Sequence, residues 1–599
     1  MTMSTPASAP AASTVRGGGW LVEPADPATL FTPEQLTEEQ RLVRQTAQEL
    51  IQKEVLPRLP ELEQKDWSLA RQLLRRCADL GLIGIDVPEA YGGVALDIVT
   101  SLVVSAKMSE SASFGAAFGG QANLTALPLF LFGTEAQKQK YLPKILSAEM
   151  VGAYCLSESG SGSDALGAKT RATRAADGGF VLNGEKMWIT NGGFADLFIV
   201  FAKVDGEHFS AFIVERAFGG LTNGKEEHKM GLHGSSTTPV VFQDVRVPAE
   251  NLLGEIGKGH KVAFNVLNFG RFKLGGMCIG GAQVAIGEAA RYAAQRRQFG
   301  QPIASFGAIR HKLGEMVVRT YAVESLLYRI AGAIDERVAR TPHEATDAAV
   351  LLATLEEFAV EASIAKVAGS EVLDFVLDEN IQIHGGNGFV KDYPAERHYR
   401  DARVNRIFEG TNEINRLLIP GMLARRAVKG DLPIIAAAKA LQDELMGPPA
   451  ATTADSDALL ADERRAVDSF KKIGLMVLGL AMQTYREKLS DQQEVLTFTA
   501  DILIDVLSAE SAVCRAVAAS TRQLPRASLQ VDAARVFVND AALRIDAAAR
   551  QALAAMAEGD TLRMTLAGLR RLLKVTPIDT VTLRRRLADE TVRSSGYIF

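Results

Sequence analysis

The sequence predicts a mainly helical protein that carries a β domain in the middle of the chain. Apolar residues fall at helical spacing over residues 37–150 and again from residue 260 onward, as in LVRQTAQELIQKEVL and AQVAIGEAARYAAQRRQF. Between these regions the pattern changes to short apolar runs separated by turn dipeptides. The order helical, β, helical does not suggest the alternating units of a parallel α/β sheet.

The N-terminal residues 1–36 are expected to form a flexible tail. They begin with a stretch rich in Ala, Ser, Thr and Gly that lacks the apolar region of a secretory signal. Arg16 is the only basic residue in MTMSTPASAPAASTVRGGGW, which is too few for a mitochondrial transit peptide. Residues 37–150 then form the N-terminal helical domain.

The middle β domain is expected over residues 151–259. Its candidate strands are FVL, LFIVFAKV, FSAFIV and PVVFQDVRV, and the turns between runs contain Asp-Gly and Asn-Gly dipeptides.

Helical spacing returns in residues 260–430, the expected helical catalytic domain. The stretch MGPPAATTADSD at residues 446–457 has the composition of a linker. Residues 431–599 are therefore expected to form an additional C-terminal helical domain.

Composition excludes several classes of protein. A formal net charge of -5 and a pI near 6.0 give no general attraction for nucleic acid, so none is expected as a partner. The four cysteines are scattered without a CxxC pair, which suits a reducing compartment such as a bacterial cytoplasm or the mitochondrial matrix. The eight histidines show neither HExxH nor another ligand spacing, so no metal site is predicted.

Several Gly-rich and aromatic segments are weak signals when each is taken alone. SESGSGSDALG fails as a dinucleotide fingerprint because Ala165 stands where the third glycine is needed, and no GK[ST] follows. WITN, with Trp188, is compatible with an ordinary β core, and the glycines of QIHGGNGF could simply end a helix. The sequence contains no GxSxG motif, which argues against a hydrolase with a serine nucleophile.

Together and in this order, however, these segments resemble the acyl-CoA dehydrogenase family. The matching segments are YCLSESGSGSD (154–164), KMWITN (186–191), RRQFG (296–300), QIHGGNG (382–388) and RIFEGTN (406–412). The resemblance covers residues 37–427, and the long C-terminal part makes the chain most similar to the very-long-chain branch and its complex I assembly relative. It implies a helical N domain, a β-barrel and a four-helix-bundle C domain, followed by the additional helical domain.

The resemblance also implies an FAD cofactor and a homodimer. The residues expected along the flavin are Tyr154, Leu156, Ser157, Ser163, Trp188, Thr190 and Thr411. Those expected to reach the FAD of the neighbouring subunit are Arg296, Phe299, Gln382, Gly385 and Gly386. Guanidinium and backbone N–H groups of the second set suit a pyrophosphate.

Glu409 resembles the base of the family, and Arg271 an arginine that orients it. The implied reaction is α,β-dehydrogenation of a fatty acyl-CoA to the trans-2-enoyl-CoA, a step of β-oxidation, with electrons passed to electron-transfer flavoprotein. The α-proton needs a carboxylate made basic by desolvation. The expected substrate-binding residues are Ser163, Asn268, Arg271, Phe408 and Gly410.

One stretch departs from the very-long-chain pattern. QANLTALP places Thr125 and Pro128 where that branch is expected to have small glycines. A larger side chain would shorten the acyl cavity and a proline would alter the helix, so a long-chain substrate is not expected.

Two other functions compete with dehydrogenation: an acyl-CoA oxidase, which lets O2 reach the reduced flavin, and a non-catalytic assembly or scaffold role. The tail from residue 561 is locally basic, with eight Lys or Arg against three acidic residues. This indicates either a solvated helical face or a peripheral contact with anionic lipid, the latter helped by the apolar run 473–482 beside Lys471 and Lys472.

Overall fold

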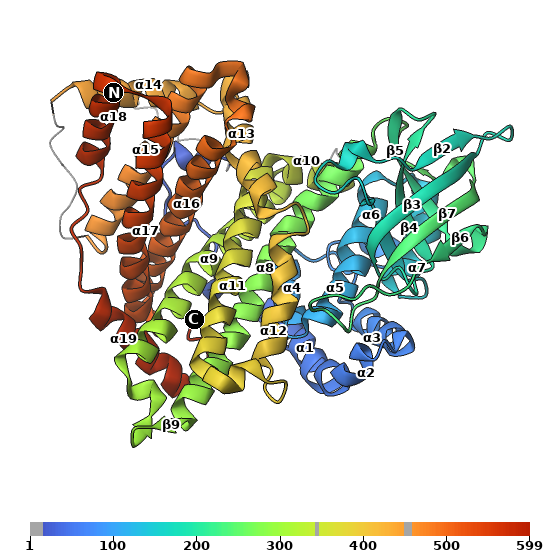
Figure 1. The fold of residues 1–599 in the computed structure, drawn as a ribbon, viewed down its shortest axis with the longest axis horizontal. Helices are drawn as coiled ribbons and strands as arrows, with labels where there is room; N and C mark the ends of the chain where they lie inside the picture. The colour runs from blue at the N-terminus through green and yellow to red at the C-terminus, as the bar shows by residue number, and fades with distance from the viewer. Residues whose placement is uncertain (1–15, 342–346, 449–457) are drawn as a thin grey trace, which may run out of the picture.

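The computed structural model describes residues 16–341, 347–448 and 458–599. The β domain lies at one end of the molecule, and two groups of long helices lie side by side at the other (Figure 1). The helical, β, helical order and the additional C-terminal helical domain predicted from the sequence are confirmed.

The N-terminal domain consists of seven short helices among the described residues. They are α1 Glu38–Leu50, α2 Leu59–Glu63, α3 Trp67–Asp79, α4 Ile98–Met108, α5 Ala112–Gln121, α6 Leu127–Phe132 and α7 Glu135–Leu146. Side chains cap the N-termini of several of these helices. Thr37 accepts a hydrogen bond from Gln40 N at the start of α1, and Asp97 accepts one from Thr100 N at the start of α4. A π-helical turn, Ala122–Ala126, joins α5 to α6.

The β domain is an eight-stranded sheet in the order β6-β7-β3-β2-β4-β5-β8, with β1 paired to β4. Its strands are β1 Gly152–Cys155, β2 Arg171–Arg174, β3 Phe180–Thr190, β4 Leu197–Val204, β5 His208–Glu215, β6 Leu221–Asn223, β7 Thr237–Val247 and β8 Leu252–Leu253. The sheet is mixed, since β4 pairs in parallel with both β1 and β2. The end strands β6 and β8 are very short and do not pair with each other.

The central helices belong to the predicted catalytic domain. They are α8 Gly259–Gln295, α9 Gly307–Arg340, α10 Asp347–Glu357, α11 Ala359–His384, α12 Ala395–Ala402 and α13 Asn412–Lys429, with the small hairpin β9 Arg297–Gln298 and β10 Gln301–Pro302 after α8. Small residues let α8 and α11 approach closely: a Cβ on Gly369 would come within 2.9 Å of Gly275 Cα.

The additional domain contains α14 Ile434–Met446, α15 Ala461–Tyr485, α16 Gln493–Thr521, α17 Ala527–Met556, α18 Gly559–Leu572 and α19 Thr580–Ser594. It packs against the catalytic helices α8, α9 and α13 through its own helices α16, α17 and α19. Arg515 of α16 is buried at this junction and bonds Glu324 of α9.

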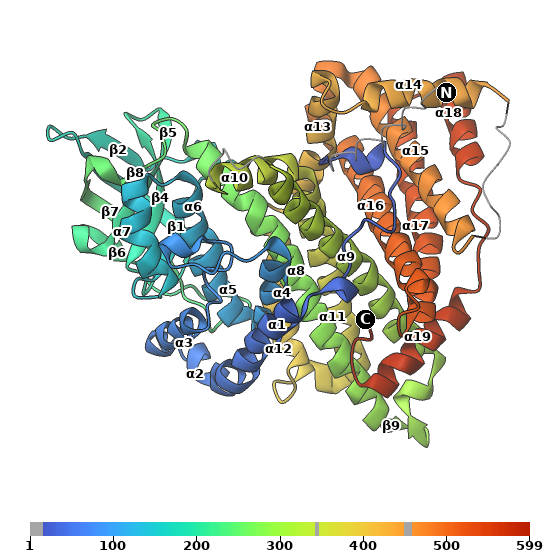
Figure 2. The ribbon, with the colours of Figure 1, turned by 180° about the vertical axis from the view of Figure 1, so that it is seen from behind.

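The segment 16–36 is ordered, although it was expected to belong to a flexible tail. Trp20 and Leu21 are buried, and Glu361 of α11 accepts hydrogen bonds from Trp20 Nε1 (2.9 Å) and Gly18 N (2.5 Å). Figure 2 shows the segment running along the helices before it reaches α1. Two buried apolar side chains and a buried carboxylate acceptor offset the entropy of ordering it. Residues 1–15 lie outside the described part.

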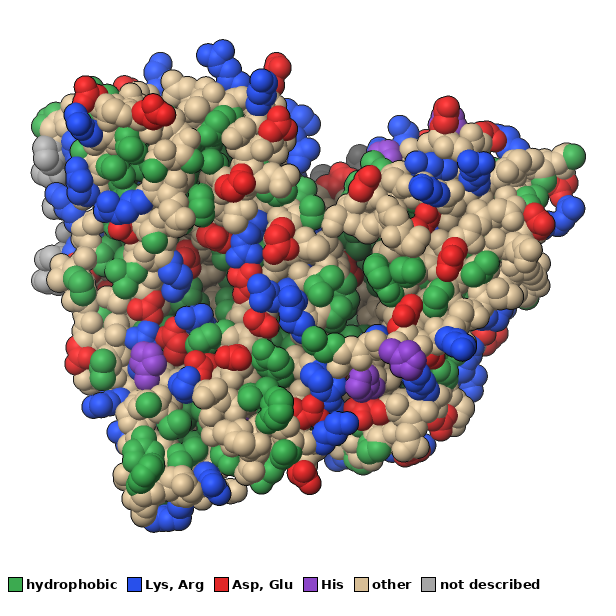
Figure 3. Space-filling view, viewed as in Figure 1, with side chains coloured by type: hydrophobic (Ala, Val, Ile, Leu, Met, Phe, Trp, Pro, Cys, Tyr) green, Lys and Arg blue, Asp and Glu red, His purple; other side chains and the backbone are tan. Residues whose placement is uncertain are grey.

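The structure does not support the lipid contact that was one of two interpretations of the basic tail and the apolar run 473–482. This run lies in α15, and Ile473, Val477 and Leu478 are fully buried against neighbouring helices. Lys471 is paired with Glu510 inside the domain. Arg584, from the basic tail, is also buried and paired with Glu315. Figure 3 shows basic and acidic side chains interspersed over the face that it presents. Within the described ranges, no helix has the length and apolar character needed to cross a bilayer.

Candidate active site

Glu409 lies in a tight turn between the 3-10 helix Arg403–Arg406 and α13. Both Glu409 (φ +56°) and Gly410 (φ +78°) are in the left-handed region, which is uncommon for a residue with a side chain. Thr411 Oγ1 accepts from Ile414 N at 3.2 Å and so caps α13. Asn415 Nδ2 donates to the Gly410 carbonyl at 2.9 Å. The turn is thus held on its far side by the helix that it starts.

The Glu409 carboxylate is buried with one oxygen free of any partner. Oε2 is inaccessible to solvent and makes no hydrogen bond. Burial raises the pKa of Glu409 to about 7, while the positive charges of Arg271 and Lys366 act in the opposite direction. A carboxylate with this pKa and an open lone pair suits proton abstraction at neutral pH.

Arg271 holds the backbone of this turn. Its Nε donates to the Glu409 carbonyl at 3.1 Å, and its Nη1 donates to Asn268 Oδ1 at 3.0 Å. The guanidinium is buried, and burial lowers its pKa. Arg271 therefore orients Glu409 through the main chain, and its charge lowers the pKa of the carboxyl group.

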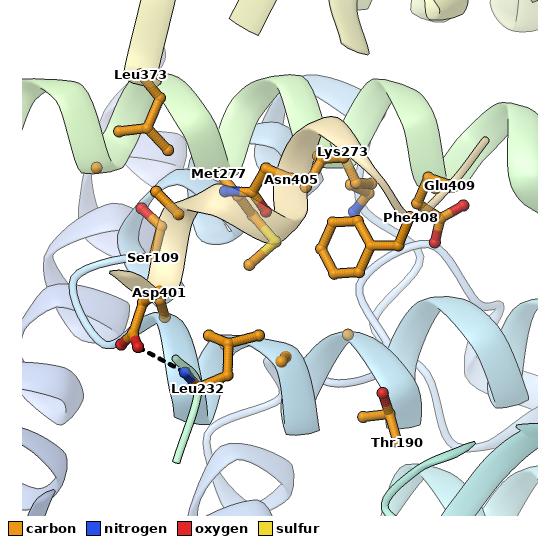
Figure 4. A pocket seen from close by; sticks show the side chains of 18 of the residues that line it. Ser109, Thr190, Leu232, Lys273, Met277, Leu373, Asp401, Asn405, Phe408 and Glu409 are labelled. Atoms are coloured by element: carbon orange, nitrogen blue, oxygen red, sulfur yellow. Dashed lines mark hydrogen bonds between the residues drawn. The ribbon is translucent and has the colours of Figure 1, made fainter. Parts of the chain in front are cut away.

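A narrow pocket extends from Glu409 between α5 and α8. Figure 4 shows Glu409, Phe408 and Thr190 toward one end, and Leu373, Ser109 and Asp401 toward the other. Its α5 wall is made of small residues: Ala112, Gly115, Ala116, Gly119 and Gly120. Its α8 wall contains Gly270, Lys273, Leu274, Met277, Gly281 and Val284. Asp401 also accepts from Leu232 N at 2.5 Å, which links α12 to the β domain.

The structure contradicts the shortened cavity expected from Thr125 and Pro128. Neither residue lines the pocket. Thr125 is fully buried on another side, where its Oγ1 donates to the Gly120 carbonyl at 2.8 Å and its side chain abuts Gly152. The π-helical turn at 122–126 adds a residue to the turn and rotates the following side chains away from an α-helical extrapolation.

The predicted flavin residues of the β domain form a wall beside this pocket. Thr190 lines the pocket, and Trp188 is 58% exposed, with φ +59°. Met187 N donates to the Ser157 carbonyl at 2.9 Å, which attaches the 156–165 loop to β3. Tyr154 and Leu156 are half-buried and Ser163 is exposed.

The other predicted cofactor residues lie apart from this wall. Arg296 and Phe299 belong to the hairpin that follows α8, and Figure 1 shows β9 far from the β domain. Phe299 is 93% exposed. Gln382, Gly385 and Gly386 end α11, and Tyr292 OH, which donates to the His384 carbonyl at 3.1 Å, ties that end to α8.

Two further residues, Gly270 and Lys366, lie beside the turn, and none of the sequence segments quoted above contains them. A Cβ on Gly270 would lie 2.8 Å from Glu409 Oε2, so only glycine leaves room for the carboxylate. Lys366 is buried, and its Nζ donates to Asn412 Oδ1 at 2.6 Å. Asn412 in turn contacts Ser370 and Glu371 of α11. The RIFEGTN segment contains Asn412, but its partners lie far away in the sequence.

Family models match in chain order. The acyl-CoA dehydrogenase N-terminal domain matches residues 37–149, the middle domain 153–245, and two models described as the acyl-CoA dehydrogenase C-terminal domain match 257–423 and 469–571. The chain belongs to the acyl-CoA dehydrogenase family. The prediction from the sequence motifs is thereby confirmed, and the fourth match extends the family to the additional domain.

Two curated acyl-CoA dehydrogenases show where the similarity extends. A probable acyl-CoA dehydrogenase of Bacillus subtilis is 45% identical over 98% of this chain and 99% of its own length. The human mitochondrial very long-chain specific acyl-CoA dehydrogenase is 43% identical over 57% of this chain and 51% of its own length.

A solved acyl-CoA dehydrogenase has nearly the same fold throughout. The crystal structure from Bacillus anthracis, described as complexed with FAD, superposes with a TM-score of 0.95 at 46% identity. The match covers 98% of this chain and all of that one, so the additional domain has the same placement in both.

Proposed function

We propose that this acyl-CoA dehydrogenase uses FAD to convert long-chain fatty acyl-CoA to trans-2-enoyl-CoA, with Glu409 as the base. The observation that carries the proposal is the buried Oε2 of Glu409, which has no partner, on a residue that lines a pocket with many small and apolar residues. Such an orphaned carboxylate oxygen is costly unless a ligand uses it.

The residues around Glu409 have different roles in proton removal. Arg271 and Asn415 hold the turn through backbone carbonyls, so the carboxylate keeps both oxygens for the substrate. Burial makes it basic enough to take the α-proton. The Glu409 N–H is the donor proposed to bind the thioester oxygen and stabilise its developing negative charge.

The residues present fit FAD. Thr190 and the exposed Trp188 provide a wall beside the pocket, and nothing lies within 4 Å of the positions where a Cβ would stand on Gly385 or Gly386. Open glycine backbone and the exposed Arg296 suit a pyrophosphate. When bound, the flavin supplies the acceptor for the hydride of the β carbon. The B. anthracis relative supports this assignment, since it is described as an FAD complex.

The separation of the two predicted groups of FAD-binding residues supports a homodimer. The hairpin with Phe299 lies far from the β-domain wall of its own chain (Figure 1). The hairpin and the end of α11 would therefore complete the FAD site of a second copy. Covering Phe299 and Phe389, which are 93% and 87% exposed, would also remove apolar surface from water.

The pocket length supports a long, unbranched acyl chain. Along α8 the lining extends from Gly270 to Val284, which corresponds to a helix length of ~21 Å. For comparison, a membrane lipid chain spans about half of a ~30 Å hydrocarbon core. The α5 wall presents only Ala and Gly over two turns, so no side chain closes the passage there.

Electron-transfer flavoprotein is the proposed acceptor. The four cysteines are free and buried, and no group of His, Cys, Asp or Glu in the described ranges is arranged to hold a metal, so these residues provide no second redox group. Electrons must then leave the flavin for an external acceptor. Unpaired cysteines also suit the reducing cytoplasm of a bacterium, which is the proposed location.

Anaerobic titration of the purified full-length protein tests the proposal. Its visible spectrum should show an oxidised flavin that bleaches on addition of acyl-CoA, most rapidly with long chains, and 2-enoyl-CoA should accumulate. Reoxidation by electron-transfer flavoprotein, with little peroxide in air, separates a dehydrogenase from an oxidase. A flavin-loaded protein that no acyl-CoA reduces would refute the catalytic function and favour the scaffold role.

Variants of the pocket wall test chain length. Ala116→Leu adds bulk to the α5 wall and should lower kcat/KM for long chains while short chains are still oxidised. Thr125→Ser is the matched control, because Thr125 lies outside the pocket, and its chain-length profile should equal that of the wild type. A profile altered by the control alone would place the wall elsewhere.

A further inference from the structure

The first turn of α13 directly follows the catalytic turn, and buried polar groups of α11 hold it. Asn412 is the first residue of the helix, three positions after Glu409. Its Oδ1 accepts from Lys366 Nζ at 2.6 Å, and its Nδ2 donates to Glu371 Oε1 at 3.1 Å. Any displacement of this turn moves Glu409, since only Gly410 and Thr411 lie between them.

Glu371 is itself held by an arginine one turn further along α13. Arg416 donates Nη1 to Glu371 Oε1 at 2.6 Å and Nη2 to Glu371 Oε2 at 2.9 Å, a bidentate pair. The same carboxylate oxygen thus receives both Arg416 and Asn412. The orientation of the Arg416 guanidinium plane consequently determines where Glu371, and through it Asn412, can lie.

The third guanidinium nitrogen of Arg416, Nε, contacts the additional C-terminal domain. Its Nε donates to Asp501 Oδ1 of α16 at 2.7 Å. Helix α13 packs against both α11 and α16, so the ion pair stands at the junction of the two bundles. Hydrogen bonds therefore run without a gap from Asp501 through Arg416 and Glu371 to Asn412.

We propose that Asp501 is a positioning residue for the reaction, through which the additional C-terminal domain holds the turn that carries Glu409. Asp501 fixes the third side of the Arg416 guanidinium and so prevents the Arg416–Glu371 pair from rotating away from Asn412. This role rests on Glu409 being the base, as proposed above. It gives the additional domain a part in catalysis besides covering the surface of α9.

Two variants of Asp501 and one control on the same helix test the proposal. In Asp501→Ala the flavin reduction rate at saturating acyl-CoA should fall about tenfold or more, because small misplacements of a reacting group are costly, while acyl-CoA affinity stays near that of the wild type. Asp501→Asn keeps an oxygen that accepts from Arg416 Nε and should restore most of the rate. In the control Asp505→Ala, the lost partner is Arg544 of α17, inside the additional domain, and the rate per bound flavin should equal that of the wild type.

A readout independent of catalysis accompanies the rates. Amide hydrogen exchange in residues 407–415 should accelerate in Asp501→Ala and remain unchanged in Asp505→Ala. If Asp501→Ala fails to load flavin, Arg416→Lys replaces it, since lysine keeps the charge but cannot bridge Glu371 and Asp501 as a planar fork. This variant should show the same slow reduction and fast exchange.

Three results would overturn the proposal. The first is a wild-type rate of flavin reduction in both Asp501→Ala and Arg416→Lys, and the second is an equally slow reduction in the Asp505→Ala control. The third is slow reduction in Asp501→Ala without faster amide exchange in residues 407–415. Failure of the function proposed above has a different signature. In that case the wild-type flavin would not be reduced by any acyl-CoA, whereas the exchange difference between the Asp501 and Asp505 variants would still be measurable.

Discussion

Buried charges have opposite arrangements in the catalytic bundle and at the junction with the additional domain. Arg515 of α16 is 1% exposed, and all three of its guanidinium nitrogens donate to carboxylates of Glu34 or Glu324 at 2.7–2.9 Å. Glu409, in contrast, has a buried oxygen without any partner. A saturated buried charge adds rigidity, whereas an unsaturated one keeps an interaction free for a ligand. Glu34 Oε2 in the Arg515 cluster is likewise without a partner, so the feature that separates Glu409 is that its side chain also lines a pocket.

Removal of the unsaturated charge should have the largest effect on the reaction. In Glu409→Gln the rate of flavin reduction should fall by about 10²–10⁴-fold or more, because the amide keeps the size but cannot take the α-proton. Rapid-mixing absorbance measures the rate, and acyl-CoA should still perturb the flavin spectrum. Flavin content is measured first as the control. Reduction at the wild-type rate would place the base elsewhere.

Removal of the saturated charge should instead reduce stability. Arg515→Leu leaves Glu34 and Glu324 buried without their cation and should lower the free energy of unfolding by about 3–5 kcal/mol. Denaturant titration followed by circular dichroism measures this change. The control Arg550→Ala removes an exposed pair with Asp546 and should cost less than about 1 kcal/mol. Similar losses in both variants would contradict the structural distinction.

A methyl group added at Gly270 should disturb the Glu409 carboxylate without removing it. Gly270→Ala would place a methyl group 2.8 Å from Glu409 Oε2 and displace the carboxylate, so reduction should slow by about 10²-fold without loss of folding. Stopped-flow kinetics measures the rate. Gly421→Ala, in α13, meets no atom within 4 Å and is the matched control. A normal rate in Gly270→Ala would show that the carboxylate has room to move.

The smallest expected effect concerns pH. In the free enzyme, kcat/KM should rise with pH through about 7, because Glu409 must lose its proton to act as a base. The charge of Lys366 lowers the pKa of Glu409, so Lys366→Met should move this rise to higher pH, and Lys366→Arg should leave it in place. The pH dependence of kcat/KM tests this. A shift to lower pH in Lys366→Met would have the wrong sign for a through-space charge effect.

The acyl pocket shows where sequence reasoning fails for a local reason. The resemblance to the very-long-chain branch predicted Thr125 and Pro128 as pocket residues. The π-helical turn at 122–126 changes the side-chain phase, and Gly119 and Gly120 line the pocket instead. A one-residue change in helical register cannot be seen in a pattern of apolar residues. The two interpretations of the apolar run of α15 could not be separated by sequence either, since burial depends on the neighbouring α16 and α17.

The sequence by itself determined the family and the order of the helical and β domains, and it predicted Glu409 as the base, because these depend on short contiguous segments and local periodicity. Only the tertiary structure decided which groups surround that carboxylate. Gly270, Lys366 and Asp501 come from α8, α11 and α16, and each acts on the 407–412 turn across a long separation in the chain. Their roles come from packing geometry, since the desolvation that raises the pKa of Glu409 and the contacts that hold its turn exist only when these helices are assembled.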